Sequence, residues 1–112
     1  MKNDMNKVKL SDILKLFEQE SCENKIDYEL TKTDCPESTK FWNFVIYYYT
    51  NLWSVKHSEP NELEIVIDND KKIMGIEFES AGDRCSRTPA WKMICKCVSE
   101  ELVFDIDLEE KL

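Results

Sequence analysis

Four short segments of the chain alternate apolar and polar residues with the two-residue period of a half-buried β-strand. Two of them, residues 62–68 and 72–79, flank the polar residues 69–71, and this arrangement predicts a β-hairpin. The other two segments are residues 25–31 and 102–109. We therefore expect four strands, of which the second and third form the hairpin.

Two further segments place apolar residues three and four positions apart, as on the buried face of an amphipathic helix. The first covers residues 11–20, and Ser11 is its candidate N-cap. The second covers residues 89–100, where Thr88 is the candidate N-cap and Pro89 stands at the first helical position. Both segments predict helices that bury one face.

A longer helix is predicted between these two, from Pro36 to about Val55. Its apolar residues form two adjoining stripes, so only a narrow polar face remains and the helix is expected at the centre of the core. Tyr47 belongs to that polar face and is a candidate interface anchor. The tryptophans are expected in the core: Trp42, Trp53 and Trp91.

The predicted order of elements is α-β-α-β-β-α-β within a single domain, residues 1–112. We expect an α+β fold in which three helices pack on one face of a largely antiparallel four-stranded sheet. That two-layer arrangement buries every apolar stripe. The pattern leaves the order of the strands open.

Charge adds a feature to this picture. The chain has 23 Asp and Glu against 15 Lys and Arg, a formal net charge of −8. If the apolar residue of each alternating pair faces the helices, the opposite face collects acidic residues from every predicted strand. Alternate residues of a strand lie about 7 Å apart and neighbouring strands about 5 Å apart, so these residues would form one patch. Its expected members are Asp27, Glu29, Glu62, Glu64, Asp68, Glu77, Glu79, Asp105, Asp107 and Glu109.

Such a patch costs stability, because like charges opposite one another on adjacent strands are unfavourable. A basic protein partner would give that cost a function, since a concentrated negative field accelerates encounter and penalises wrong partners. The alternative is a merely solvated face whose ends are neutralised by Lys25, Lys32, Lys71 and Lys72. The net charge disfavours direct binding to nucleic acid or to an anionic membrane.

Residues that could carry chemistry are few. The single histidine, His57, stands in a polar stretch after the predicted central helix and is expected at the surface. The five cysteines have no paired-motif spacing, so we expect reduced thiols, with Cys95 in the core. Two acidic pairs, Asp68 with Asp70 and Asp105 with Asp107, lack the glycine and the closing glutamate of a calcium loop. We therefore expect no enzymatic activity, no metal and no cofactor.

In character, the chain resembles the small acidic immunity proteins of bacterial toxin systems, such as those of nuclease colicins and of contact-dependent growth inhibition. The resemblance covers the whole chain and lies in its size, acidic strands, aromatic core and lack of an active-site motif. It implies a protein that binds and neutralises a cognate basic toxin domain, in particular a nuclease, by competing for the cations that hold phosphates.

The absence of an apolar run long enough for a membrane span or a secretory signal predicts a cytoplasmic location. Two other functions remain open. One is a phage-type mimic of nucleic acid that inhibits a host protein, which shares the electrostatics but would bind several basic proteins. The other is a small enzyme or a metal-binding protein.

Overall fold

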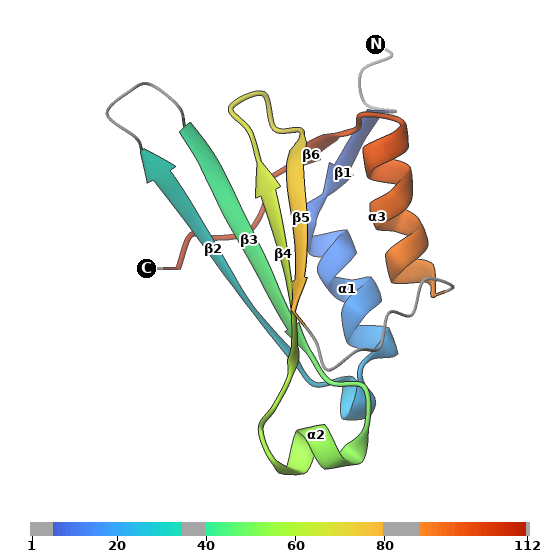
Figure 1. The fold of residues 1–112 in the computed structure, drawn as a ribbon. Coiled ribbons are helices and arrows are strands. Elements are labelled where there is room, and N and C mark those ends of the chain that lie inside the picture. Colours follow the sequence, from blue (N-terminus) through green and yellow to red (C-terminus); the bar gives the residue numbers. More distant parts are fainter. Residues whose placement is uncertain (1–5, 35–39, 80–87, 112) are drawn as a thin grey trace.

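The computed structural model describes residues 6–34, 40–79 and 88–111 (Figure 1). These form an α+β structure with three α-helices, a four-stranded antiparallel sheet and a separate parallel pair of strands. In chain order the elements are β1 (Lys7–Lys9), α1 (Leu10–Glu20), the 3₁₀ helix η2 (Cys22–Asn24), β2 (Ile26–Asp34), β3 (Lys40–Tyr48), α2 (Leu52–Lys56), β4 (Asn61–Ile67), β5 (Ile73–Glu79), α3 (Pro89–Ser99) and β6 (Val103–Asp105).

The main sheet is an antiparallel meander in the order β2-β3-β4-β5, so strands that follow one another in the chain are also neighbours in space. One row of apolar residues crosses all four strands in register: Leu30, Phe44, Ile65 and Ile76. The first three have no solvent exposure. This row is the centre of the core and defines the inner face of the sheet.

Two helices and the C-terminal segment cover the inner face (Figure 1). The buried side chains of the two helices are Leu10, Ile13 and Phe17 in α1 and Ala90, Ile94 and Cys97 in α3. The backbone N–H of Phe104 donates to the carbonyl of Lys71, in the β4–β5 turn, at 2.8 Å. The backbone N–H of Lys111 donates to the carbonyl of Leu30, in β2, at 2.7 Å. The C-terminal segment therefore reaches from one edge of the sheet to the other.

The start of α3 follows the prediction. Thr88 is the N-cap, its hydroxyl accepts a hydrogen bond from the N–H of Trp91, and Pro89 occupies the first turn. A second acceptor comes from α1, where a carboxylate oxygen of Glu20 takes the N–H of Ala90 at 2.8 Å. The first N–H groups of a helix have no intrahelical partner, so both acceptors satisfy this end of α3, and the one from Glu20 also joins α1 to α3.

The predicted central helix is wrong for most of its length. Residues 40–48 form β3, and only Leu52–Lys56 are helical; the predicted start at Pro36 lies outside the described residues. The run from Phe41 to Tyr49 is almost wholly apolar, so it fits a helical stripe and a strand equally well. Its aromatic and β-branched residues favour a strand, and two flanking strands supply the hydrogen bonds that a strand needs.

The predicted closing strand is also placed differently. β6 does not join the main sheet but pairs in parallel with β1, with Val8 opposite Phe104. It ends at Asp105, where the N–H of Asp107 bonds back to the Asp105 carbonyl. β1 has only three residues, which is too short a pattern to predict from sequence. The main sheet still has four strands, because the residues of the predicted central helix form β3, and β3 replaces the predicted closing strand.

Two other expectations fail in the helices. α2 lies at the tip of the sheet between β3 and β4, not on the inner face (Figure 1), and its Trp53 is 58% exposed. In α3 the buried sulfur belongs to Cys97, whereas Cys95 is exposed. Trp42 and Trp91 do pack against the core, as predicted.

Within the described ranges, no helix is both long and apolar enough to cross a bilayer.

The strand assignment of residues 40–48 can be tested by comparing two neighbouring positions. Phe44 is fully buried on the inner face, whereas Val45 lies on the outer face. Phe44→Ala should lower the free energy of unfolding by about 3–5 kcal/mol, because it removes the centre of the core row. Val45→Ala should cost much less. Urea denaturation of both variants measures this, and similar losses would point to a helix that buries both residues.

Candidate functional site

The outer face of the main sheet is formed by the polar half of the strand alternation. In β4 the residues that alternate with the buried Leu63 and Ile65 are Glu62 and Glu64, which are exposed and partly exposed. Successive side chains of a strand point to opposite faces. Burial of the apolar residues therefore forces these two carboxylates outward.

Two rows of residues cross the outer face in register. The first is Glu29, Val45, Glu64 and Glu77. The second is Asp27, Tyr47, Glu62 and Glu79, of which the Glu79 side chain lies outside the described residues. We call the five described carboxylates the acidic face: Asp27, Glu29, Glu62, Glu64 and Glu77. They come from β2, β4 and β5, and the structure brings them together as predicted.

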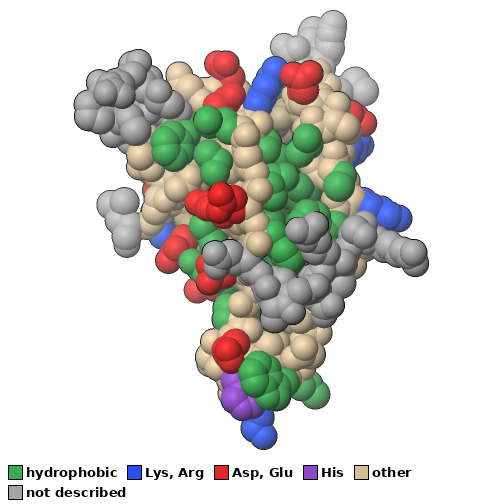
Figure 2. Space-filling model, in the orientation of Figure 1, with side chains coloured by type: hydrophobic (Ala, Val, Ile, Leu, Met, Phe, Trp, Pro, Cys, Tyr) green, Lys and Arg blue, Asp and Glu red, His purple; other side chains and the backbone are tan. Residues whose placement is uncertain are grey.

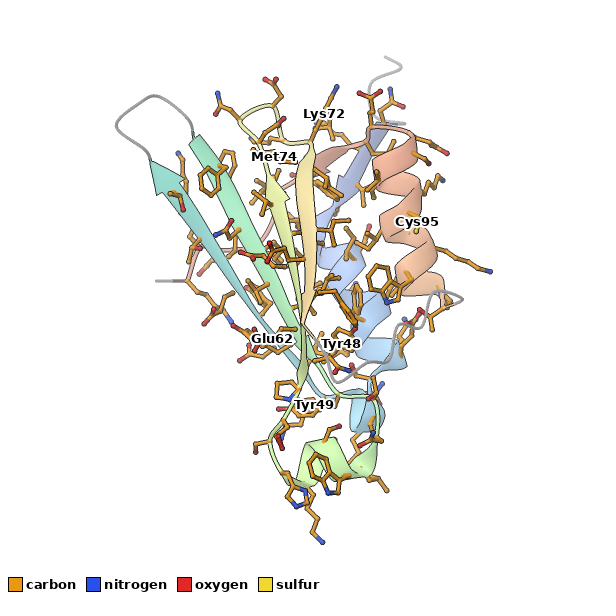
Figure 3. The ribbon with its side chains drawn as sticks, in the orientation of Figure 1. Tyr48, Tyr49, Glu62, Lys72, Met74 and Cys95 are labelled. Atoms are coloured by element: carbon orange, nitrogen blue, oxygen red, sulfur yellow. The ribbon has the colours of Figure 1, made fainter. Side chains whose placement is uncertain are left out.

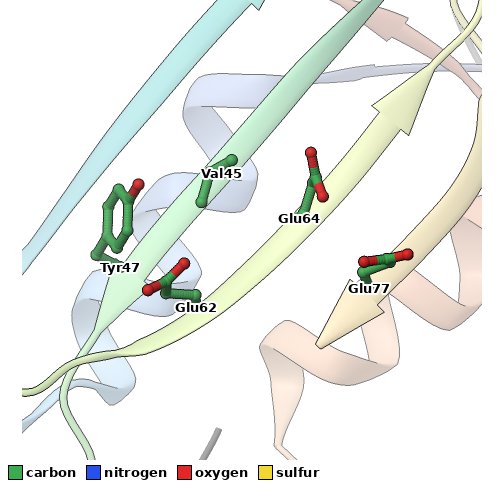
Figure 4. Close-up of a pocket in the computed structure, with 5 residues that line it drawn as sticks. All are labelled: Val45, Tyr47, Glu62, Glu64 and Glu77. Carbon is green, nitrogen blue, oxygen red and sulfur yellow. The ribbon is translucent and has the colours of Figure 1, made fainter. Parts of the chain in front are cut away.

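A shallow hollow of about 230 Å³ lies within the acidic face (Figure 4). Val45 and Tyr47 of β3 line it on one side, and three carboxylates, those of Glu62, Glu64 and Glu77, line it on the other. Glu64 and Glu77 occupy directly opposite positions on neighbouring strands. Like charges so placed repel, so the hollow has a strong negative potential.

Tyr47 lies among these carboxylates and responds to them. Its hydroxyl donates a hydrogen bond to the Glu29 carboxylate at 2.9 Å. The pKa of Tyr47 rises from its usual 10.0 to about 12, first because of burial, then because of the bond to Glu29 and the charges of Glu29, Glu62 and Asp27. The predicted anchor is therefore a neutral phenol on a strand, embedded in the acidic face, and not a residue on the polar side of a helix.

The lysines expected to neutralise this face lie mostly over aromatic rings. Their ammonium groups stand 5.5 Å from the ring centre of Tyr49 for Lys25, and 5.3 Å and 5.6 Å from that of Trp42 for Lys32 and Lys71. In the part of the chain that the structure describes, one ion pair reaches the acidic face, between Lys111 and Asp27 at 3.5 Å. Both side chains are well exposed, so this pair contributes little. Figure 2 shows the carboxylates on the outer face, with basic side chains toward its periphery.

Four predicted members of the patch lie elsewhere. Asp68 caps the β4–β5 turn by accepting from the N–H groups of Asp70 and Lys72, at 2.8 and 3.0 Å. Asp105 belongs to β6, and Asp107 and Glu109 to the C-terminal segment. Asp105, Asp107 and Glu109 are absent from the outer face because β6 pairs with β1 and does not join the main sheet.

Asp107 has a structural contact that the sequence did not indicate. Its carboxylate accepts hydrogen bonds from the backbone N–H of Ser11, at 3.0 Å, and from the Ser11 hydroxyl. Ser11 is thus not the N-cap of α1, and a residue 96 positions away satisfies this end of the helix instead. Partial burial opposes ionisation of Asp107, but the bonds from Ser11 outweigh it and lower the pKa of the carboxyl group.

Groups suited to catalysis are dispersed. As predicted, His57 is exposed and ends a helix, here α2, with its ring stacked on Trp53. Burial raises the pKa of the Cys97 thiol to about 11, which keeps it protonated at neutral pH. Over residues 6–34, 40–79 and 88–111, no three His, Cys, Asp or Glu side chains group as metal ligands would. Two of the five cysteines, Cys35 and Cys85, lie outside these ranges.

Sequence reasoning missed two features of this surface. Val45 lines the hollow, and Trp53 is exposed in α2, between β3 and β4. Both were assigned to the apolar stripes of a helix. The signal that could have found Val45 is the two-residue alternation of Trp42, Phe44 and Ile46 within the same run.

Comparisons with known proteins add no relative: no protein-family model matches this sequence, and no match was found among curated proteins or solved structures.

The Asp107 contact makes stability depend on pH. A carboxyl group whose pKa is lower in the folded state stabilises the protein above its unfolded pKa, near 3.8, and this contribution disappears as pH falls through the folded pKa. Asp107→Asn should therefore lower the free energy of unfolding by about 1 kcal/mol at neutral pH. The difference from the wild type should shrink below pH 3.8. Urea denaturation across this range measures both, with Glu109→Gln as the control.

The electrostatics of the outer face can be measured at Tyr47. Near-UV absorbance titration, with Tyr47→Phe as the reference, should give a pKa of about 12. Glu29→Gln should bring this value back toward 10.0, because it removes a charge that opposes phenolate formation. Since the folded pKa is raised, the wild type should lose stability between pH 10.0 and 12 more steeply than Tyr47→Phe. An unchanged titration in Glu29→Gln would contradict the assigned cause.

Proposed function

We propose that this chain is an immunity-type inhibitor that binds a cognate basic bacterial toxin domain through the acidic face and thereby neutralises it. The observation that carries the proposal is the arrangement of five carboxylates from three strands on one surface, with a single exposed ion pair among the described residues. Mixed charges would serve solubility equally well, without the repulsion between neighbouring carboxylates. A surface of one sign is suited to a partner of the opposite sign.

A nuclease toxin is the partner that best fits this charge. Nucleases hold phosphates with lysines and arginines, so a protein that presents carboxylates competes for the same cations. Glu64 and Glu77 lie opposite one another on neighbouring strands, about 5 Å apart, and carboxylates along β2 and β4 are about 7 Å apart, so several cations can be engaged together. In this proposal the chain acts in the cytoplasm, where the toxin would reach nucleic acid, and inhibits by occupancy with no catalytic step of its own.

The proposal predicts that charge on the outer face controls association. The triple variant Glu62→Gln, Glu64→Gln, Glu77→Gln should slow association with the partner at least about tenfold and flatten its dependence on salt. The same variant should unfold at a higher temperature, because the repulsion between Glu64 and Glu77 is removed. Weaker binding by a more stable protein cannot be attributed to misfolding.

The matched control is a second triple variant, Glu18→Gln, Glu100→Gln, Glu110→Gln, which removes the same charge from exposed positions outside the acidic face. Affinity capture from bacterial lysate identifies the partner, and surface plasmon resonance with the purified partner compares the variants. One basic protein, whose nuclease activity falls stoichiometrically with added inhibitor, supports the proposal. Capture of several unrelated basic proteins would favour a nucleic-acid mimic, and equal effects of both triple variants would reject a localised site.

A further inference from the structure

Helix α2 presents two large apolar side chains to solvent at the tip of the sheet. Leu52 is 64% exposed and Trp53 is 58% exposed. We call these two residues the apolar tip. Scattered apolar residues are ordinary on a protein surface, but an exposed tryptophan is unusual, since tryptophan buries more area than any other side chain and is enriched in interface hot spots.

Contacts at both ends of α2 hold the helix and the Trp53 side chain in place. Asn51 and Ser54 form a capping box, in which the Asn51 side chain accepts from the Ser54 N–H at 2.8 Å. The His57 ring stacks on the Trp53 indole with centroids 4.3 Å apart and planes 21° apart. The same ring bonds through Nδ1 to the Trp53 carbonyl at 2.8 Å, and Nδ1 is the donor because a carbonyl only accepts. Little conformational entropy is therefore left to lose when the tip is buried.

The apolar tip adjoins the acidic face. α2 connects the end of β3, where Tyr47 lies, to the start of β4, where Glu62 lies. In the view of Figure 2 the histidine and the adjacent apolar side chains of α2 appear below the carboxylates of the outer face. Figure 3 shows the same order, with Glu62 between the helix and the upper part of the sheet. One partner that covers the acidic face therefore lies within reach of the tip.

Charge decides which partner can cover the tip. An anionic membrane would be repelled by the adjoining carboxylates, and a second copy of the chain would bring two acidic surfaces together. A basic protein is attracted by the same field. We propose that Trp53, with Leu52 beside it, inserts into an apolar pocket of the basic protein that the acidic face binds. This inference rests on the proposed function.

The two parts of the surface would then have separate kinetic roles. Carboxylates at long range raise the association rate, whereas a buried aromatic anchor lowers the dissociation rate. Trp53→Ala should raise Kd at least about 30-fold, almost wholly through faster dissociation, with the salt dependence of association unchanged. The glutamine triple variant of the acidic face should instead slow association and leave the dissociation rate nearly unchanged.

The experiment uses the full chain and, as the probe, the purified basic protein that the wild type captures. Met74→Ala is the matched control, because Met74 is 55% exposed and lies at the opposite end of the sheet from α2 (Figure 3). A photo-crosslinking residue at position 53, and in a second variant at position 74, tests contact directly. A crosslink from position 53 alone, together with the faster dissociation of Trp53→Ala, supports the inference. Since Trp53 is exposed, thermal unfolding should be nearly unchanged.

The outcomes separate this inference from the proposed function. If the acidic-face variant weakens binding and Trp53→Ala does not, the proposed function stands and the inference is wrong. If no single basic protein is captured, or neither variant changes Kd, both are wrong. Trp53-dependent binding to vesicles of phosphatidylcholine and phosphatidylglycerol would overturn the inference in favour of a lipid surface. Trp53-dependent dimerisation in sedimentation experiments would overturn it in favour of a second copy.

Discussion

The alternation of side chains across the main sheet is the constraint on which the rest of this structure depends. The core row of Leu30, Phe44, Ile65 and Ile76 packs on one face, so the residues one position along each strand must project from the other. Those residues include Glu29, Glu64 and Glu77. A shift of one residue in pairing would bury the carboxylates and expose the core. The register that stabilises the protein is therefore the register that assembles the acidic face.

Four lysines that could neutralise that face contact aromatic rings. Three lysines stand over aromatic rings, and Lys111 is shared between the Tyr28 ring, 3.9 Å away, and Asp27. Attraction between an ammonium group and a ring adds to this placement. Three other carboxylates serve structure: Asp68 in a turn, Glu20 at the start of α3 and Asp107 at the start of α1. Negative charge is thus used locally for capping and collectively on the outer face.

The proposed interface combines two kinds of interaction that act at different ranges. The acidic face acts over the distance of electrostatic screening, about 10 Å at moderate salt, and the apolar tip acts only on contact. Their junction lies at Tyr47 and Glu62, where β3 and β4 meet the loop that carries α2. The capping and stacking contacts of α2 hold Trp53 in place, so the proposed surface needs little rearrangement on binding.

The sequence by itself determined the features that depend on near neighbours: α1, the β4–β5 hairpin, the Thr88 cap of α3 and the outward direction of the β2, β4 and β5 carboxylates. Each follows from a periodic pattern or from a cap within a few residues. Only the tertiary structure decided that Phe41 to Tyr48 form a strand, because a nearly continuous apolar run satisfies both periods and the flanking strands select one. It also decided that β6 pairs with β1, which removes Asp105 and Asp107 from the face. The same strand assignment of β3 leaves only the short α2 between β3 and β4, where Trp53 is exposed. Such outcomes depend on partners far away in the chain, whose positions no local pattern encodes.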